Sequence, residues 1–304
     1  MKLVTYRRHP ADAGRLGALV DDTVVDIARL GEATGEPLPG TMLDFIDLGS
    51  DAVRVASDLL DEMRGDWPLG VRLPRASVTL LAPIPRPRKN VFGIGLNYLE
   101  HIAEAARGLD TPAGMPEAPV VFSKPPTAVI GPDAPILHNA AMTQQLDWEV
   151  ELAVVMGTAA TRIDEAAAMD HVFGYSVMLD VSARDNRRAG QWIFSKGQDS
   201  YAPFGPCIVT ADEIDDPHDL ALWLTKNGEE KQRSNTGFMY FRIPQLIADI
   251  SSGMTLEPGD VIATGTPEGV GAGREPQEWM WPGDVIEYGV EGIGKMRNPV
   301  VKIG

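Results

Sequence analysis

Cysteine is almost absent from this chain of 304 residues, which contains a single one, Cys207. One cysteine forms no internal disulfide and no thiolate metal cluster, which favours a reducing compartment. Apolar runs are short as well, and none reaches the roughly 18 to 20 residues of a membrane-spanning helix. The first residues, MKLVTYRRHP, lack the apolar core and cleavage site of a signal peptide. We therefore expect a cytoplasmic protein with no membrane partner.

Basic residues are scarce, because 27 Lys and Arg stand against 43 Asp and Glu and give a formal net charge of -16. A surface of this sign repels nucleic-acid backbones, so we expect no nucleic-acid partner. It gives an anionic substrate no general attraction either, so such a substrate needs a bound cation or locally placed Lys and Arg. Neither dinucleotide-binding nor P-loop glycine signatures follow a strand-like segment, so no nucleotide cofactor is expected.

The chain divides at a proline-rich stretch. Residues 1–75 contain the strand-like runs KLVTYRR and GALVDDTVVDI, followed by helical patterns at residues 41–48 and 51–64. Four prolines between residues 73 and 88 then prevent regular pairing. We therefore expect a small N-terminal α+β domain, residues 1–75, and a larger domain, residues 76–304.

The larger domain is rich in short β-like runs separated by Gly and Pro, such as VELAVVMG, VFGYSVML and DVIEYGVEGIG. Helical patterns in it are short and cover residues 99–107, 163–169 and 243–251. These patterns predict an α+β fold that is β-rich, with a sheet folded over on itself.

Three carboxylates interrupt apolar, strand-like segments: Glu149 and Glu151 in DWEVELAVVMG, and Asp180 at the end of VFGYSVMLD. An ionised carboxylate removed from water is costly unless it is paired or bound to a cation. Residues two apart on a strand point to the same face, and oxygen ligands without thiolate favour Mg²⁺, Mn²⁺ or Ca²⁺ over zinc. The alternative is that Asp147, Glu149 and Glu151 form the solvated face of a half-exposed strand.

A histidine and a glutamate lie three residues apart in GLNYLEHIAEAARG, which places His101 and Glu104 on one face of a helix. A carboxylate that holds one imidazole nitrogen leaves the other to accept a proton near neutral pH. The pair could equally be an ordinary surface contact. The following segment, GLDTPAGMPEAP, is a candidate lid.

Two lysines follow apolar and aromatic residues, Lys124 in VVFSKPP and Lys196 in WIFSKGQD. Both are candidates to face the site. In the alternative, their aliphatic stems cover a hydrophobic rim while the ammonium groups reach water.

Arginines and a glycine-rich turn supply candidate carboxylate contacts. Arg184, Arg187 and Arg188 follow Asp180 closely in DVSARDNRRAG, and one of them could bind a substrate carboxylate through two hydrogen bonds. Thr266 lies in the turn of DVIATGTPEGVG, where backbone N–H groups and a hydroxyl could bind an anion. The same turn could simply be a tight β connection.

Taken together and in order, these segments resemble the fumarylacetoacetate hydrolase family, including bacterial members that act on acylpyruvates and related 2-oxo acids. The resemblance runs from about Asn90 to Val301 and includes GLNYLEHIAE, DWEVELAVVMG, QWIFSKGQDSYAPFGP and GDVIEYGVEGIGKMRNPV. It implies a catalytic domain with a mixed β-roll or sandwich fold, a requirement for Mg²⁺ or Mn²⁺ (with Ca²⁺ possible in crystals), and a homodimer.

The resemblance also implies a role for each matching residue. The metal ligands are Glu149, Glu151 and Asp180, the catalytic residues are His101, Glu104 and Lys196, and the substrate contacts are Arg184 and Thr266. Tyr98, Lys124 and Arg187 are further candidate substrate contacts that the resemblance does not itself assign. Two departures stand out. The lysine block reads KGQD where the family usually has KSFD, and Arg187 stands where the family often has glutamine.

The implied activity is metal-dependent hydrolysis of a carbon–carbon bond in a 1,3-dicarbonyl 2-oxo acid, such as an acylpyruvate, a fumarylpyruvate-like acid or a 2,4-dioxo sugar acid. His101 would activate water and Lys196 would stabilise the oxyanion. The alternatives on the same metal-enolate site are decarboxylation of oxaloacetate, or isomerisation or hydration of 2-hydroxyhepta-2,4-diene-1,7-dioate. A catalytically silent metal- or metabolite-binding module is a further alternative, but such a module has no use for a histidine–glutamate dyad.

Overall fold

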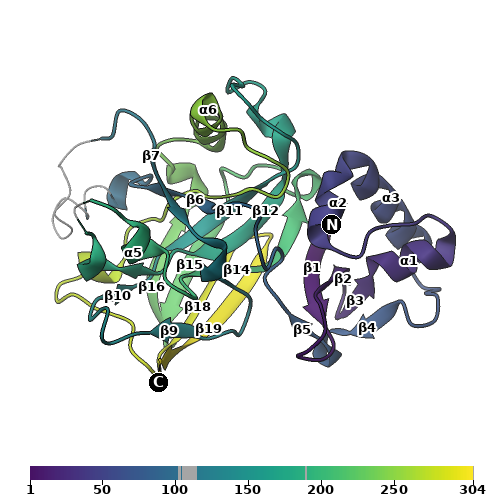
Figure 1. The fold of residues 1–304 in the computed structure, drawn as a ribbon, viewed down its shortest axis with the longest axis horizontal. Helices are drawn as coiled ribbons and strands as arrows, with labels where there is room; N and C mark the ends of the chain where they lie inside the picture. Colours follow the sequence, from purple (N-terminus) through teal and green to yellow (C-terminus); the bar gives the residue numbers. More distant parts are fainter. Residues whose placement is uncertain (102–103, 105–114, 189, 304) are drawn as a thin grey trace.

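Two parts make up the molecule in Figure 1, a small N-terminal unit of helices and strands in purple and a larger, β-rich body. The computed structural model describes residues 1–101, 104, 115–188 and 190–303. Strands predominate over helices in it, so the expected β-rich α+β class is confirmed. Within the described ranges, no helix has both the length and the apolar character needed to cross a membrane.

The N-terminal unit is a small sheet covered by helices. Its strands are β1 (Lys2–Arg7), β2 (Arg15–Val20), β3 (Thr23–Asp26), β4 (Arg72–Pro74) and β5 (Thr79–Leu80), and its helices are α1 (Ile27–Thr34), α2 (Met42–Asp47) and α3 (Gly49–Glu62). The expected division at residues 75 and 76 stays a prediction, and β5 beyond it pairs with β1.

Helix α1 has clear signals at both ends. The Asp26 side chain accepts a hydrogen bond from the Arg29 N–H in the first turn, and Gly35 ends the helix at φ 82°. A positive φ is cheap only for glycine, so this residue is suited to the C-terminal cap. Helix α3 buries Ala52, Ala56 and Leu59, which recur at helical spacing on one face.

The larger body contains most of the strands. They are β6 (Val91–Gly95), β7 (Val120–Lys124), β8 (Val129–Ile130), β9 (Ile136–His138), β10 (Leu146–Asp147), β11 (Val150–Met156), β12 (Val172–Leu179), β13 (Ser182–Ala183), β14 (Ala202–Thr210), β15 (Ala221–Lys226), β16 (Glu229–Asn235), β17 (Val261–Ala263), β18 (Val285–Val290) and β19 (Gly294–Lys302). Its helices with both ends among the described residues are α5 (Ile193–Lys196) and α6 (Ile243–Gly253), and its short 3₁₀ turns include η3 (Ala168–His171), η4 (Arg184–Asn186) and η7 (Gly271–Gly273).

One large sheet runs through both parts in the order β4-β3-β2-β1-β14-β12-β11-β17-β6-β7. Strand β1 pairs with β14, with Leu3 opposite Ile208, so the N-terminal unit continues the sheet that carries β11 and β12. A second sheet has the order β16-β15-β18-β19-β9. In Figure 1 its strands β15, β18 and β19 lie beside β11 and β14.

Alternation along β11 decides what each face of the large sheet contacts. Val150, Leu152 and Val154 belong to the hydrophobic cluster shared with the second sheet. Ala153 and Val155 point the other way, into the cluster that contains the N-terminal helices. By the same alternation, Glu151 at the start of β11 shares this second face.

One sequence-based helix prediction differs from the structure, and one helix was not predicted. Residues 163–169 form turns that lead into η3 rather than an α-helix, because the alanine-rich run DEAAAMD has too little apolar surface on one face to pack as a longer helix. Helix α1 was not predicted, although Asp26 and Gly35 are its sequence signals. Leu99 to His101 and Glu104 are helical, whereas the rest of the pattern at residues 99–107 and most of the candidate lid lie outside the described residues.

Candidate active site

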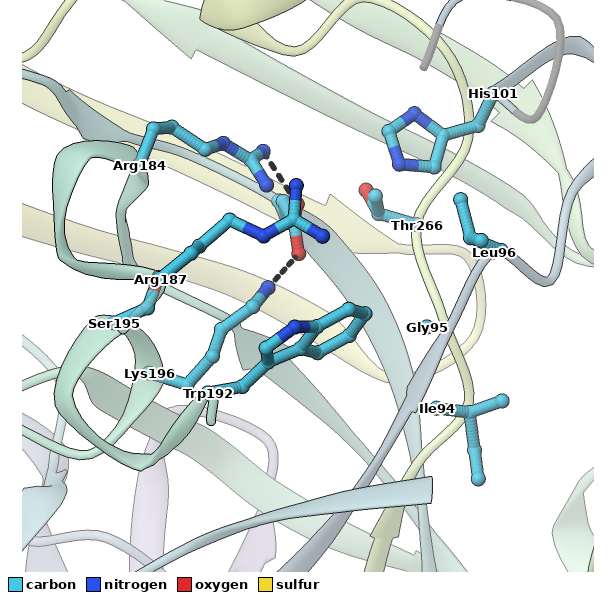
Figure 2. A pocket seen from close by; sticks show the side chains of 11 residues that line it. Ile94, Gly95, Leu96, His101, Arg184, Arg187, Trp192, Ser195, Lys196 and Thr266 are labelled. Carbon is cyan, nitrogen blue, oxygen red and sulfur yellow. Dashed lines mark hydrogen bonds and ion pairs between the residues drawn. The ribbon is translucent and has the colours of Figure 1, made fainter. Parts of the chain in front are cut away.

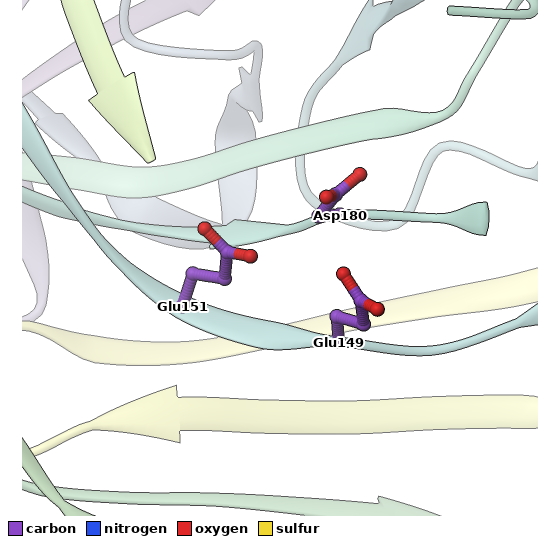
Figure 3. Close-up of side chains that lie close together, drawn as sticks. All are labelled: Glu149, Glu151 and Asp180. Carbon is purple, nitrogen blue, oxygen red and sulfur yellow. The ribbon is translucent and has the colours of Figure 1, made fainter. Parts of the chain in front are cut away.

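Glu149, Glu151 and Asp180 meet where β11 and β12 run side by side (Figure 3). Asp180 directly follows β12, and its backbone N–H donates to the carbonyl of Glu149 at 2.8 Å. One carboxylate oxygen from each residue lies within 4.8 Å of the others, and all three residues are buried. Glu151 is 1% exposed and Glu149 4% exposed, so the alternative of a solvated strand face is wrong.

Three cations surround these carboxylates. Lys196 at the end of α5 donates to both Glu149 and Asp180 at 2.6 Å. Arg184 in η4 donates to Glu149 at 2.5 Å and to Asp147 at 2.8 Å. The triad is therefore held by residues from separate segments of the chain.

Lys124, the third cation, ends β7 and is completely buried. It donates to Asp180 at 2.5 Å and to the carbonyls of Val181 and Lys196. The structure thus places Lys124 behind the triad and outside the cavity lining, although it was predicted as a substrate contact. The alternative in which its ammonium group reaches water is wrong.

The residues fit a divalent cation. Among the described residues, Lys124, Arg184 and Lys196 pair with Asp147, Glu149 and Asp180, whereas the buried carboxylate of Glu151 is in no ion pair. Burial, reinforced by the charges of Asp180 and Glu149, raises the pKa of Glu151 well above its usual value. Oxygen-only donors and unbalanced negative charge match a hard divalent metal such as Mg²⁺ or Mn²⁺.

His101 and Glu104 form the expected dyad. His101 Nδ1 lies 3.1 Å from Glu104 Oε2, and the Gly269 N–H donates to both carboxylate oxygens, at 3.1 and 3.3 Å. Both side chains are buried, so the alternative of an ordinary surface pair is wrong. The contact through Nδ1 leaves Nε2 as the nitrogen that can exchange a proton with a substrate.

A narrow cavity, partly open to solvent, lies beside the triad (Figure 2). It is lined by Ile94, Gly95, Leu96, His101, Glu149, Arg184, Arg187, Trp192, Ser195, Lys196 and Thr266. In Figure 2, Arg184, Arg187 and Lys196 lie on one side of the cavity, and His101 and Thr266 lie on the other. A bound anion would therefore contact a cationic wall opposite the dyad.

Two predicted substrate contacts differ in their surroundings. The Thr266 hydroxyl donates to the Val150 carbonyl and accepts from Gln232 Nε2, both at 2.9 Å, while its side chain still borders the cavity. Tyr98 is completely buried and does not line the cavity. Its hydroxyl has no hydrogen-bond partner among the described residues, and burial together with the nearby Glu151 raises its pKa.

Several site residues were missed at the sequence level. Asp147 is held by Arg184 and by the glycine-rich loop, and its alternation with Glu149 and Glu151 was the available signal. Trp192 borders the cavity beneath the Arg187 guanidinium, whose central carbon lies 5.0 Å from the ring centroid. Gln232, which accepts from the Val150 N–H, gave no signal because strand EEKQRSN looks like an ordinary polar strand.

Comparison with known proteins assigns this arrangement to a family. The family model described as the C-terminal part of fumarylacetoacetate hydrolase matches residues 90–301, which include the triad, the dyad and the cavity. The chain belongs to the fumarylacetoacetate hydrolase family. The family predicted from the sequence is thereby confirmed, and the fold agrees with solved structures of its members.

Curated relatives of this fumarylacetoacetate hydrolase family member include oxaloacetate tautomerases. The mitochondrial enzyme fahd2 of Xenopus laevis is 38% identical over 99% of this chain and 90% of its own length. The enzyme YisK of Bacillus subtilis is 38% identical over 94% of this chain and 95% of its own length. Because one relative is named as mitochondrial, the cytoplasmic location of this chain stays a prediction.

Similar solved structures belong to family enzymes with other reactions. Maleylpyruvate hydrolase from Sphingobium sp. SYK-6, in complex with manganese(II) and pyruvate, has a TM-score of 0.78 and 30% identity, with full coverage of both chains. The 2-hydroxyhepta-2,4-diene-1,7-dioate isomerase from Mycobacterium marinum has a TM-score of 0.74 and 32% identity, covering 100% of this chain and 99% of its own. These relatives are enzymes, and the manganese complex together with the buried triad supports divalent metal binding.

Proposed function

We propose that this family member enolises a 2-oxo dicarboxylic acid with the help of Mg²⁺ or Mn²⁺, and that oxaloacetate is its substrate. One observation carries the proposal: the cavity places the triad and a cationic wall opposite a buried histidine–glutamate dyad. Such a site can hold two negative charges and move one proton. The two oxaloacetate tautomerases that resemble the chain over most of their length support the same reaction.

The triad would hold the metal through Glu149, Glu151 and Asp180. When bound there, a divalent metal draws electron density from the 2-oxo group and makes the neighbouring C–H more acidic. The protein residues then have to orient the acid and transfer the proton.

His101 is the residue that transfers it. Its Nε2 takes the proton from C3 of oxaloacetate, and the C–H bonding electrons form the C2=C3 double bond while the 2-oxo oxygen gains negative charge. Return of the proton to that oxygen gives the enol, and the reverse sequence regenerates the keto form. Glu104 keeps Nδ1 protonated and stabilises the imidazolium that forms between these steps.

Arg187 is suited to the second carboxylate of the substrate. Glu149 holds Arg184 and Lys196, and Arg187 adds a third positive charge to the same wall of the cavity. Stacking over Trp192 orients its guanidinium plane. An oriented guanidinium binds a carboxylate through two parallel hydrogen bonds, so this position favours dicarboxylic over monocarboxylic 2-oxo acids.

The test is a tautomerisation assay with freshly dissolved enol-oxaloacetate, followed by the loss of its ultraviolet absorbance. We expect the enzyme with Mn²⁺ to accelerate the loss well above the rate with Mn²⁺ alone, and a chelator to abolish the difference. Pyruvate is measured in parallel, because its appearance would indicate decarboxylation. If enzyme and free metal give the same rate, the proposed tautomerisation is wrong.

Carbon–carbon hydrolysis, which the resemblance implied, is the second candidate. The manganese- and pyruvate-containing structure of maleylpyruvate hydrolase favours it, because pyruvate is a product of acylpyruvate cleavage. Here His101 would take a proton from water as the oxygen adds to the distal carbonyl. Collapse of this adduct would break the bond between the distal carbonyl carbon and C3, release the acid and leave the electron pair on the pyruvate enolate, which takes the proton back from His101. A panel of acylpyruvates and 2,4-dioxo acids, analysed for pyruvate and the released acid, tests this reaction, since only hydrolysis yields both products.

A further inference from the structure

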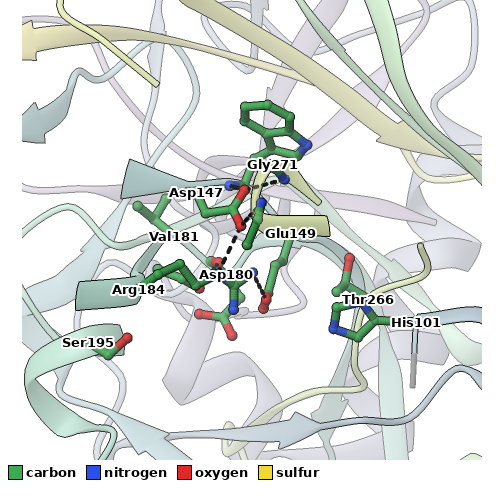
Figure 4. Close-up of polar contacts among 12 residues, drawn as sticks. His101, Asp147, Glu149, Asp180, Val181, Arg184, Ser195, Thr266 and Gly271 are labelled. Atoms are coloured by element: carbon green, nitrogen blue, oxygen red, sulfur yellow. Dashed lines mark hydrogen bonds and ion pairs between the residues drawn. The ribbon is translucent and has the colours of Figure 1, made fainter. Parts of the chain in front are cut away.

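Asp147 is a fully buried carboxylate with a saturated set of donors (Figure 4). It accepts from the N–H groups of Gly271 at 2.6 Å, Ala272 at 3.0 Å and Trp148 at 2.8 Å. Its fourth donor is Arg184 Nε, at 2.8 Å. The Asp147 side chain therefore holds the backbone of the glycine-rich loop, residues 269–273, through the N–H groups of Gly271 and Ala272.

The same loop is the seat of Glu104, which means that it hydrogen-bonds the Glu104 carboxylate and packs against its side chain. The Gly269 N–H donates to the Glu104 carboxylate, while the Gly269 carbonyl accepts from the Trp148 indole N–H at 3.1 Å. At Gly273 a methyl group would overlap the Glu104 side chain, so the loop leaves space for this carboxylate only because residue 273 is glycine. The position of Glu104, and hence of His101, follows from the position of the loop.

Asp147 also contacts the metal triad through one intermediary. Arg184 divides its guanidinium between Asp147 and Glu149. Hydrogen bonds therefore run from Glu149 through Arg184 and Asp147 to the loop, and from the loop through Glu104 to His101. Asp147 joins the two halves of the active site without lining the cavity.

We propose that Asp147 and Trp148 are positioning residues, which fix loop 269–273 as the seat of Glu104 and so aim His101 at the substrate. This inference rests on the proposed function in that His101 acts there as the base. Neither residue touches the substrate, and both act only through the loop. In one segment of the chain, Asp147 and Trp148 thereby position the base, and the next residue, Glu149, belongs to the metal triad.

The chemistry of an amide shows why Asp147→Asn is informative. Asparagine keeps one acceptor oxygen but turns an NH₂ group toward N–H donors that the carboxylate accepted. The loop must shift away, Glu104 loses its seat, and the Nδ1–H of His101 loses its acceptor. Gly273→Ala displaces Glu104 directly and leaves every contact of Asp147 in place. Trp148→Phe removes the indole N–H and keeps an aromatic ring.

The experiment compares these three variants with the wild type in two ways. The first is ¹⁵N NMR of the imidazoles of the five histidines, which reports which nitrogen of His101 is protonated. We expect Nδ1–H in the wild type and a mixture dominated by Nε2–H in Asp147→Asn and Gly273→Ala. The second is steady-state kinetics, where we expect kcat to fall about 10²-fold with KM changed less than threefold in Gly273→Ala, because base catalysis is lost and the cavity walls remain.

Asp260→Asn is the matched control. Asp260 is also buried, accepts from a backbone N–H (that of Glu257, at 2.8 Å) and from a cation (Lys89, at 2.7 Å), and lies outside the cavity lining. We expect this variant to be destabilised while its His101 spectrum stays that of the wild type. A wild-type His101 spectrum in Asp147→Asn would overturn the proposal whatever Gly273→Ala shows, as would a spectral change of equal size in Asp260→Asn.

The NMR measurement needs no substrate, so the two proposals fail separately. If oxaloacetate is not tautomerised but His101 changes its protonated nitrogen in Asp147→Asn, the positioning role stands and the proposed function is wrong. If the enzyme is active and the variants keep both the spectrum and kcat, the positioning role is wrong and the function stands. Should Asp147→Asn not fold, Trp148→Phe decides the question, because it removes the hydrogen bond to the Gly269 carbonyl. A shift of the His101 spectrum toward Nε2–H in this variant supports the positioning role, and a wild-type spectrum overturns it.

Discussion

Glu149 and Glu151 lie two residues apart, yet their pKa values move in opposite directions. Burial raises the pKa of both carboxyl groups. At Glu149 the positive charges of Arg184, Lys196 and His101 outweigh the effect of burial and hold the pKa well below its usual range. Glu151 lies next to two other carboxylates, and its hydrogen-bond donor is the Gly265 N–H at 2.9 Å, so its pKa rises instead. Glu151 is therefore the member of the triad whose charge depends most on a bound cation.

His101→Ala tests the base. Because general base catalysis contributes roughly 10²- to 10⁴-fold, we expect kcat to fall by that factor. Mn²⁺ affinity, measured by calorimetry, should change little, since His101 is not among the triad. His171→Ala is the matched control, because His171 lies in η3 outside the cavity. Near-normal turnover in His101→Ala would contradict the assignment.

Arg187→Gln tests the choice of substrate. A hydrogen bond to a charged group contributes about 1.5 to 3 kcal/mol, so kcat/KM for oxaloacetate should fall roughly 10- to 100-fold. Exchange of the C3 protons of 2-oxobutyrate with D₂O, followed by NMR, should change far less because this acid has a single carboxylate. Equal losses for both acids would show that Arg187 supports the cavity rather than recognising the second carboxylate.

For single residues, the sequence predicted which side chains belong to the site better than it predicted which of them pair with one another. The spacing of Glu149 and Glu151 indicated a shared face, and their apolar surroundings indicated a cation. Which cation pairs with which carboxylate depends on strands far apart in the chain, as with Lys124 from β7 and Asp180 after β12. For that reason the sequence led us to expect Lys124 as a substrate contact. It did not reveal that Lys124 lies behind the triad.

Among the elements, the junction of β3 and α1 depends on one buried carboxylate. Asp26 accepts from Tyr6 Oη at 2.5 Å, from Arg15 Nε at 2.8 Å and from the Arg29 N–H at 3.0 Å. Burial opposes its ionisation, but the hydrogen bonds from Arg15 and Tyr6 outweigh burial and lower its pKa. One side chain thus caps a helix and joins three segments of the N-terminal unit.

Asp26→Asn should destabilise the protein by about 2 kcal/mol, through the loss of a helix cap and of charge-assisted hydrogen bonds. Because the folded-state pKa of Asp26 is lowered, its contribution is present above the unfolded-state pKa and is lost as the pH falls through the folded-state value. Urea unfolding at neutral and acidic pH measures both effects, and the difference between wild type and variant should shrink in acid.

Asp47→Asn is the control for this prediction. Asp47 pairs with Arg88 at 2.5 Å, but both side chains are 39% exposed, so its loss should cost less than about 1 kcal/mol. Equal destabilisation by the two substitutions would contradict the role given to Asp26.

Element prediction succeeded where a long amphipathic pattern was present. Helices α2, α3 and α6 match the patterns at residues 41–48, 51–64 and 243–251. The order of strands in the sheets could not be predicted, because pairs such as β1 with β14 join segments about 200 residues apart and leave no local pattern.

For the whole molecule, the triad predicts stabilisation by metal. A ligand that binds only the folded state stabilises it by RT ln(1 + [L]/Kd), which is about 2.7 kcal/mol at a hundredfold excess over Kd. Mn²⁺ should therefore raise Tm by several degrees in scanning calorimetry, and Glu151→Gln should reduce the shift. An unchanged Tm with both Mn²⁺ and Mg²⁺ would contradict a metal site.

The homodimer implied by the family resemblance stays a prediction. Analytical ultracentrifugation should give twice the 32.8 kDa of one chain, and a mass of 32.8 kDa at micromolar concentration would contradict it.

The β1–β14 pairing determines whether the N-terminal unit can be removed or exchanged. Strand β14 lies between β1 and β12, the strand that leads to Asp180. A truncated protein that starts at residue 76 would keep β8 beside Ala202 but leave β14 unpaired at Ile208 and Val209, an exposed edge that invites pairing with other chains and aggregation. Grafting the N-terminal unit of a relative onto this catalytic part therefore requires a first strand that reproduces the register of Leu3 opposite Ile208.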